Sequence, residues 1–402
     1  MKFLTFKEPA KVLFIGAEAA PFVKVGGLAS VMDSLPRALR EIGCDARVMI
    51  PKYLPIEGKY KLTTVLEDIK VPTGNTEGPA TLVCNVKKFT PKTAADPVIS
   101  YFLENEEYYE KRSNVYGYAD DAIRWALFCR GTIEFLRLHK EWRPDVIVAC
   151  DWQTGLIVNF LKTEYADDPQ VNKIATIFSI HNLSYQGMFD HRFVQEMDRD
   201  DGHSRVPAFE SDRLNKINSM RRGIMHADMV TTVSPTYARE IVTPEYGELL
   251  DGILRERRNV LTGILNGIDY TIWNPQNDPY IMHPYGKDDS AERARNKAVL
   301  QERLGLENDK NAFVIGIASR LTRQKGFDLL MPIADIIMSE LPVQIAVVGT
   351  GDTDLMAFFR DLESKYPRRV AAHLAFDGIL PHVIFAGADA ALMPSLFEPC
   401  GL

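Results

Sequence analysis

The sequence predicts an α/β protein of two domains, each built on a doubly wound parallel sheet. Its 402 residues are too many for one ordinary core. In the first half, short apolar runs alternate with helical patterns, and the same alternation restarts after a polar segment over residues 274–290. We therefore expect one domain over residues 1–262 and a second over residues 263–402.

The first domain opens with an apolar run at residues 11–16, which predicts a buried strand followed by a loop with proline and glycine. Apolar residues then recur with helical spacing over residues 28–42, and Gly43 ends that helix. The remaining elements expected here are a helix over 121–138 and strands over 46–50, 146–149 and 174–180.

The second domain repeats this order of elements. We expect strands over 313–319, 344–348 and 390–393, helices over 327–341, from 355 and near 382, and an apolar run over 370–376. Open sheets of this type bind ligands at the carboxyl ends of their strands. The cleft between the two units is therefore the expected site.

Composition excludes several classes of function. A net charge of −7 argues against a nucleic-acid partner, which would require clustered basic residues. The five cysteines contain no C-x-x-C pair, so neither a disulfide framework nor a zinc site is expected. No long apolar span or signal-peptide core is present, so we expect a cytoplasmic protein with no membrane partner.

A glycine pair joins the first strand to the first helix. Within Lys24–Leu28, Gly26 and Gly27 would let backbone N–H groups approach an anion at a helix N-terminus, and Lys24 adds positive charge. The segment lacks the dinucleotide pattern G-x-G-x-x-G, so a plain structural turn is the alternative.

Two segments of the second domain also follow predicted strands. Arg320 and Lys325 would face the cleft and stabilise an anionic leaving group such as a diphosphate, unless the loop is merely basic and solvated. Glu398 follows the last strand, where a carboxylate can also serve as a cap or surface charge. His181 follows the strand that ends at Ile180, and a core histidine is the alternative there.

Many short motifs occur along nearly the whole chain in a fixed order. They are Glu18 with Pro21, Lys24–Ala29, Asp45–Val48, Tyr118–Asp120, Trp142–Val146, Asp151–Trp152, His181–Gly187, Val233–Ala238, Ile264–Asp269, Trp273–Pro275, Ser319–Gly326 and Phe397–Gly401. Together they resemble the bacterial glycogen synthase and plant starch synthase family.

The resemblance implies a GT-B fold, in which two Rossmann-like domains face each other across a cleft. It also implies transfer of glucose, with retention, from ADP-glucose or UDP-glucose to the non-reducing end of an α-1,4-glucan. The first domain would hold the glucan and the second the nucleotide sugar, which is a co-substrate. No metal or other cofactor is expected.

Site residues follow from the matching motifs. Lys24, Gly26 and Gly27 correspond to the donor and diphosphate loop, and Arg320 and Lys325 to the phosphate-binding cations. Glu398 corresponds to the carboxylate against the transferred glucose. Further substrate contacts are expected from Asp151, His181, Asn182, Tyr185 and Gln186.

Three positions depart from the family pattern. Ser30 replaces an acidic residue, Cys150 a histidine expected beside the transferred glucose, and Leu396 an arginine. We expect reduced but retained activity. Asp33 is expected on the solvated face of its helix. Because the family continues well past the Phe397–Gly401 motif, we also expect the second domain to be incomplete.

Two other functions fit parts of the pattern. Another retaining GT-B glycosyltransferase would share the basic pair and the late glutamate, but not the Lys24–Leu28 loop. A non-catalytic glucan-binding protein could have kept the fold and lost turnover, as the three departures would suggest.

Overall fold

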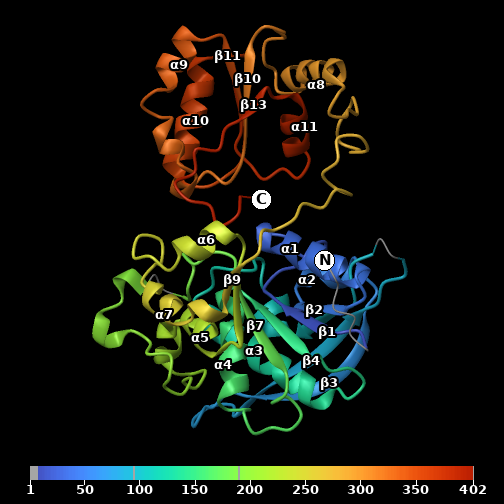
Figure 1. Cartoon of the computed structure of the whole chain (residues 1–402), viewed down its shortest axis with the longest axis vertical. Helices are drawn as coiled ribbons and strands as arrows, with labels where there is room; N and C mark the ends of the chain where they lie inside the picture. The colour runs from blue at the N-terminus through green and yellow to red at the C-terminus, as the bar shows by residue number, and fades with distance from the viewer. Residues whose placement is uncertain (1–7, 94–95, 189–190, 402) are drawn as a thin grey trace. The chain divides into compact units, whose positions relative to one another are not determined.

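The structure is a computed structural model that describes residues 8–93, 96–188 and 191–401. The described chain divides into two compact α/β units (Figure 1). The first consists of Met1–Asn266 with Pro399–Leu402, and the second of Gly267–Glu398. The division falls after Asn266, and Pro399 packs with the first unit, where its carbonyl accepts a hydrogen bond from Ser234 Oγ at 2.7 Å.

The first unit is built on a nine-stranded sheet of order β3-β4-β5-β2-β1-β6-β7-β8-β9 within the described residues. The strands from β5 to β9 in this order pair in parallel, whereas β3 and β4 add an antiparallel hairpin at one edge. The bounds are β1 Lys11–Ile15, β2 Asp45–Pro51, β3 Thr63–Pro72, β4 Thr81–Phe89, β5 Ser100–Glu104, β6 Val146–Cys150, β7 Ala175–Ile180, β8 Met229–Thr232 and β9 Leu261–Gly263.

Helices cover this sheet and complete one large apolar core. The central strands are apolar because both of their faces are buried. Helix α3 is buried nearly all round between the sheet and α4. The helices of the unit are α1 Gly27–Glu41, α2 Leu54–Glu57, α3 Asp121–Leu138, α4 Gly155–Lys162, α5 Ser219–His226, α6 Pro235–Glu240 and α7 Asp251–Glu256.

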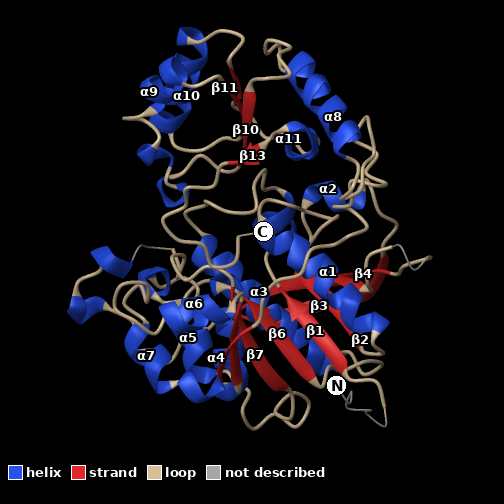
Figure 2. Cartoon of the chain, turned by 45° about the horizontal axis from the view of Figure 1, so that its top comes forward, coloured by secondary structure: helices blue, strands red, loops and turns tan. Residues whose placement is uncertain are grey.

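Strand β1 marks the point where this sheet reverses its winding. It pairs with β2 on one side and β6 on the other, and Figure 2 shows β1, β6 and β7 side by side. The loops after β1 and β6 therefore leave the same carboxyl edge in opposite directions, an arrangement that opens a ligand site in such folds.

The second unit contains a four-stranded parallel sheet of order β12-β11-β10-β13 among the described residues. Its reversal lies at β10, between β11 and β13. Separate apolar clusters cover its two faces, one with α9 and α10 and the other with α8 and α11. The bounds are β10 Phe313–Ala318, β11 Val343–Val348, β12 Val370–His373, β13 Ala390–Ala391, α8 Ser290–Arg303, α9 Ala334–Glu340, α10 Thr353–Lys365 and α11 Leu380–Gly387.

Two details differ from the sequence analysis. The helix expected over 327–341 is interrupted, and α9 begins only at Ala334, because Pro332 has no N–H group with which to continue a helix. Asp33 is buried at 7% exposure and pairs with Arg37 at 2.5 Å, so its expected place on a solvated face is wrong. No helix in the described part of the chain is long and apolar enough to cross a membrane.

Candidate functional site

The loops after β10 and β13 meet at the carboxyl edge of the second sheet. Leu396 N–H donates to the Gln324 carbonyl at 3.0 Å, which joins the two loops directly. Gly326 has φ +68°, and a Cβ there would lie 2.0 Å from the Pro394 carbonyl oxygen. Only glycine combines this backbone conformation with so close an approach.

This junction brings two of the predicted catalytic residues together. Lys325 Nζ lies 2.5 Å from Glu398 Oε1, and Ser395 Oγ donates to the same oxygen at 2.7 Å. Both charged side chains are largely buried, with 15% and 23% exposure. Among the described residues, Oε2 of Glu398 has no hydrogen-bond partner, so one carboxylate oxygen stays available to a ligand.

Arg320 lies on the same loop but is exposed and does not join the pair. The described residues offer it no ion-pair partner. The loop itself is anchored to the segment after β11, since Leu321 exchanges hydrogen bonds with Thr350 and Asp352 at 3.0 and 2.7 Å. Arg320 therefore extends from a fixed backbone as an unneutralised cation.

In the first unit, the loop after β1 is organised around Glu18. This carboxylate is only 2% exposed, and its Oε2 accepts the N–H groups of Val25 at 2.5 Å and Gly26 at 3.0 Å. Burial raises the pKa of Glu18, against the opposing effect of these N–H groups and of Lys24. The Gly26 N–H, which we expected to bind an external anion, thus donates to a carboxylate of the protein itself.

The other residues of this loop are less constrained. Gly27 begins α1, and a Cβ placed on it would meet no atom within 4 Å. Lys24 is exposed. The structure therefore brings Gly26 against Glu18, while Gly27 and Lys24 remain open to a ligand.

Asp151 occupies the corresponding place after β6. Its backbone has φ +59°, and its Oδ1 accepts the N–H groups of His181 at 2.7 Å and Asn182 at 3.2 Å. Burial raises the pKa of Asp151 to about 7, and the charge of Glu18 contributes in the same direction. At pH near 7 the carboxyl group is therefore divided between its protonated and its ionised form. Its hydrogen bonds tie the loop after β6 to the loop after β7.

Tyr116 completes this group, and the sequence analysis did not identify it as a site residue. Its hydroxyl donates to Glu18 Oε1 at 3.3 Å. Burial raises the pKa of Tyr116, and the charge of nearby Glu18 raises it further. Glu18 was recognised only as part of a motif, although it is the first acidic residue after β1. Tyr116 lies in an irregular segment before α3 and has no periodic signal.

The predicted residues after β7 fall into two groups. Burial lowers the pKa of His181 to about 4, so its imidazole is neutral, and its Nε2 lies 3.2 Å from Ser179 Oγ. Asn182 Oδ1 accepts the Ser184 N–H at 3.1 Å, and Tyr185 is exposed.

Gln186 is held by the protein at both ends of its amide. Its Nε2 donates to the Glu248 carbonyl and its Oε1 accepts from Asn218 Nδ2, both at 2.7 Å. These bonds fix the loop, and they leave Gln186 less free for substrate than expected.

Comparison with known proteins identifies the chain. Residues 11–256 match the family of the starch synthase catalytic domain. The glycogen synthase of Geobacillus stearothermophilus is 42% identical over 397 residues, which cover 98% of this chain and 79% of the relative. That of Thermotoga maritima is 40% identical over 400 residues, with the same coverage.

The chain belongs to the glycogen synthase and starch synthase family.

A solved structure agrees with this assignment. The catalytic domain of starch synthase IV from Arabidopsis thaliana, bound to ADP and acarbose, superposes with a TM-score of 0.83 at 28% identity, covering 98% of this chain and 80% of that one. The predicted family and the GT-B fold class are confirmed, and the protein is a glucosyltransferase. The incompleteness of its second domain stays a prediction.

The three departures from the family pattern lie in different surroundings. Cys150 is 2% exposed within the core of the first unit, and burial raises the pKa of its thiol, so it is an uncharged packing group. Leu396 is 57% exposed, and Ser30 is partly buried on α1. The thiol of Cys150 therefore does not supply the polar contact that the family's histidine is expected to make.

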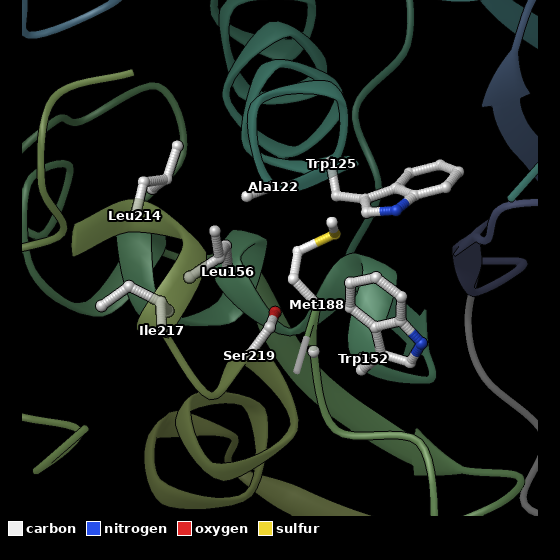
Figure 3. A pocket seen from close by; sticks show the side chains of 9 residues that line it. Ala122, Trp125, Trp152, Leu156, Met188, Leu214, Ile217 and Ser219 are labelled. Atoms are coloured by element: carbon white, nitrogen blue, oxygen red, sulfur yellow. The ribbon is translucent and has the colours of Figure 1, made fainter. Parts of the chain in front are cut away.

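A small cavity in the first unit of this glucosyltransferase is lined by Trp152, Trp125 and Met188, among others (Figure 3). Its volume of about 20 Å³ is far below the several hundred that a sugar-sized ligand occupies. Trp125 packs edge to face with Trp152, with ring centroids 6.2 Å apart. The cavity is therefore a small packing gap beside Trp152 and not a sugar site.

One group of described residues has the composition of a metal site. Glu57, Glu104 and Glu110 bring their carboxylates together. However, Lys52 Nζ occupies the centre of the group, 2.5 Å from Glu57 and 2.6 Å from Glu104, and in contact with Glu110. The lysine already supplies the positive charge that a metal ion would bring.

Proposed function

We propose that this glucosyltransferase moves glucose from ADP-glucose, or alternatively UDP-glucose, to the non-reducing end of an α-1,4-glucan with retention of configuration. The observation that carries the proposal is the Lys325–Glu398 pair at the reversal of the second sheet. The ADP in the related plant structure supports an adenine nucleotide as donor.

The charges at this edge suit the departure of a nucleoside diphosphate. When the bond between the glucose C1 and the β-phosphate breaks, the electron pair leaves with the diphosphate. Lys325 and Arg320 would stabilise that charge in place of a metal ion, because they stand on a loop that is already fixed. Glu398 would keep Lys325 aligned through Oε1, and its Oε2 would accept a hydrogen bond from a glucose hydroxyl.

The carboxyl edge of the first sheet suits the neutral acceptor. Burial raises the pKa of Asp151 to about 7, so this carboxyl can donate to the glucan when protonated and accept from it when ionised. The Tyr116 hydroxyl donates to Glu18 and can still accept a hydrogen bond. We infer that Asp151 and Tyr116 bind the terminal sugar and that Glu18 positions Tyr116. The 4-hydroxyl of that sugar would attack C1 on the face from which the diphosphate departs, and would give its proton to the departing diphosphate.

The direct test is incorporation of labelled glucose into glycogen from each donor. We expect a higher kcat/KM with ADP-glucose, and we expect β-amylase to release the incorporated label, since that enzyme cleaves only α-1,4-linked chain ends. Incorporation from neither donor would contradict the proposal. In that case, retained binding of glycogen would favour the non-catalytic alternative.

A further inference from the structure

A second concave region lies in the second unit and shares no residue with the Lys325–Glu398 site. It is a groove of about 510 Å³ between α8, α11 and residues 279–282, lined by Tyr280, Met282, Val299, Glu302, Arg303 and Val383, among others. This volume lies in the range of sites for small organic ligands.

One wall of the groove is held rigidly. The buried Asp278 accepts the Tyr280 N–H at 2.9 Å through Oδ1, and its Oδ2 lies 2.6 Å from His382 Nδ1. Trp273 stacks on the same imidazole with the ring planes 1° apart and the centroids at 4.1 Å. The segment that carries Tyr280 is thereby fastened to α11.

The far end of the segment is fastened to α8. Asn296 accepts the His283 N–H at 3.1 Å and donates to the His283 carbonyl at 2.7 Å. Between these two anchors, Tyr280 and Met282 stay 45% and 68% exposed. The backbone that presents these two large side chains is thus held at both ends, which lowers the entropic cost of ordering it on binding.

Two charged side chains of α8 also line the groove. Glu302 and Arg303 are both exposed in the last turn of α8, and the described residues give neither side chain a hydrogen bond or an ion pair. The carboxylate only accepts and the guanidinium only donates. Because the two charges are adjacent and opposite, they provide both an acceptor and a donor without a net charge that would select an ion.

A sugar chain matches this combination. Its hydroxyls both donate and accept, and its apolar C–H faces pack on aromatic rings such as that of Tyr280. We propose that the groove is an auxiliary binding site for an α-1,4-glucan, separate from the catalytic edges. The inference rests on the proposed function, which makes such a glucan the acceptor.

An auxiliary site would act through avidity. A long chain held in the groove raises the effective concentration of its free ends for transfer, whereas a short oligosaccharide bound there has no further length to offer. The groove should therefore affect the use of glycogen and leave the use of maltotriose unchanged.

The experiment compares Tyr280→Ala and Arg303→Ala in the full chain with the wild type. We expect both variants to lose retardation in native gels that contain glycogen, and to raise the apparent KM for glycogen about tenfold or more. The KM for maltotriose and kcat should not change. Tyr280→Phe keeps the ring and should behave nearly as the wild type.

Tyr270→Ala is the matched control, since Tyr270 is 74% exposed in the same connecting segment and does not line the groove. Unchanged gel retardation and glycogen KM in Tyr280→Ala would overturn the inference. A lower solution mass in that variant would also overturn it, because the groove would then be an interface between copies. Gel retardation does not need turnover, so failure of the proposed function would appear separately, as absent transfer to maltotriose.

Discussion

Lys325 Nζ lies 2.5 Å from Glu398 Oε1, although the two residues are 73 positions apart in the chain. They meet because β10 and β13 are parallel neighbours, so the loops that follow them leave the same edge of the sheet. The cation proposed to act on the leaving group is thus aligned by the carboxylate proposed to contact the glucose.

Replacement of Lys325 by alanine should lower kcat by about 100-fold or more, since a cation that acts on the departing diphosphate is felt mainly in the transition state. The KM for glycogen should stay close to that of the wild type. Steady-state rates with labelled donor measure both quantities. Lys365→Ala is the control, because it breaks a 2.7 Å pair with Asp335 in the same unit, away from the site. A near-normal kcat in Lys325→Ala would refute the assigned role.

Gly326→Ala should destabilise the second unit and reduce activity together. The alanine would be strained by about 1–3 kcal/mol at φ +68°, and its Cβ would also collide with the Pro394 carbonyl. Thermal unfolding and donor kinetics would show both effects. Gly378→Ala is the matched control, since its Cβ meets no atom within 4 Å and its φ is not positive. Equal melting temperatures for the two variants would contradict the close packing at Gly326.

Asp151 should make folding pH-dependent. Its pKa is raised from 3.8 to about 7 in the folded state, so between these values the folded protein binds a proton that the unfolded chain does not. Its contribution to the free energy of unfolding therefore falls as pH rises through this window, by a few kcal/mol. Asp151→Asn keeps an oxygen acceptor for His181 and Asn182 but cannot titrate, so this contribution should disappear.

Denaturant unfolding at several pH values would measure the difference between wild type and Asp151→Asn. The comparison isolates Asp151, because His181, whose pKa is lowered to about 4 and whose effect on stability has the opposite sign, is present in both proteins. Parallel pH profiles for the two proteins would show that the Asp151 carboxyl titrates normally.

Treatment with EDTA should leave the rate of glucose transfer unchanged, because Lys325 and Arg320 are proposed to provide the charge that a metal ion would otherwise bring to the diphosphate. Initial rates before and after chelation measure this directly. A loss of rate that Mg²⁺ restores would show that the two cations do not suffice.

Much of the Lys325–Glu398 site could be predicted from the sequence. Strands such as β1 and β10 are continuous apolar runs, so their ends and the polar residues after them could be read from the sequence. The contacts at the carboxyl edge of the first sheet could not be predicted in this way. Tyr116 lies in an irregular segment, and the contact that ties it to Glu18 spans 98 positions. Nor could the sequence reveal that the side-chain amide of Gln186 is hydrogen-bonded to Glu248 and Asn218.

The sequence alone therefore determined the α/β class, the order of most strands and helices, and the family, because these depend on periodicity and on short motifs within local segments. The tertiary structure decided the order of strands in each sheet, and through it the pairing of Lys325 with Glu398 and the meeting of Glu18 with Tyr116. It also decided that the Gly26 N–H binds Glu18, and that Asp33 and Cys150 are buried. The physical reason is that burial, pKa shifts and hydrogen-bond partners arise from atoms distant in the chain, which no local pattern specifies.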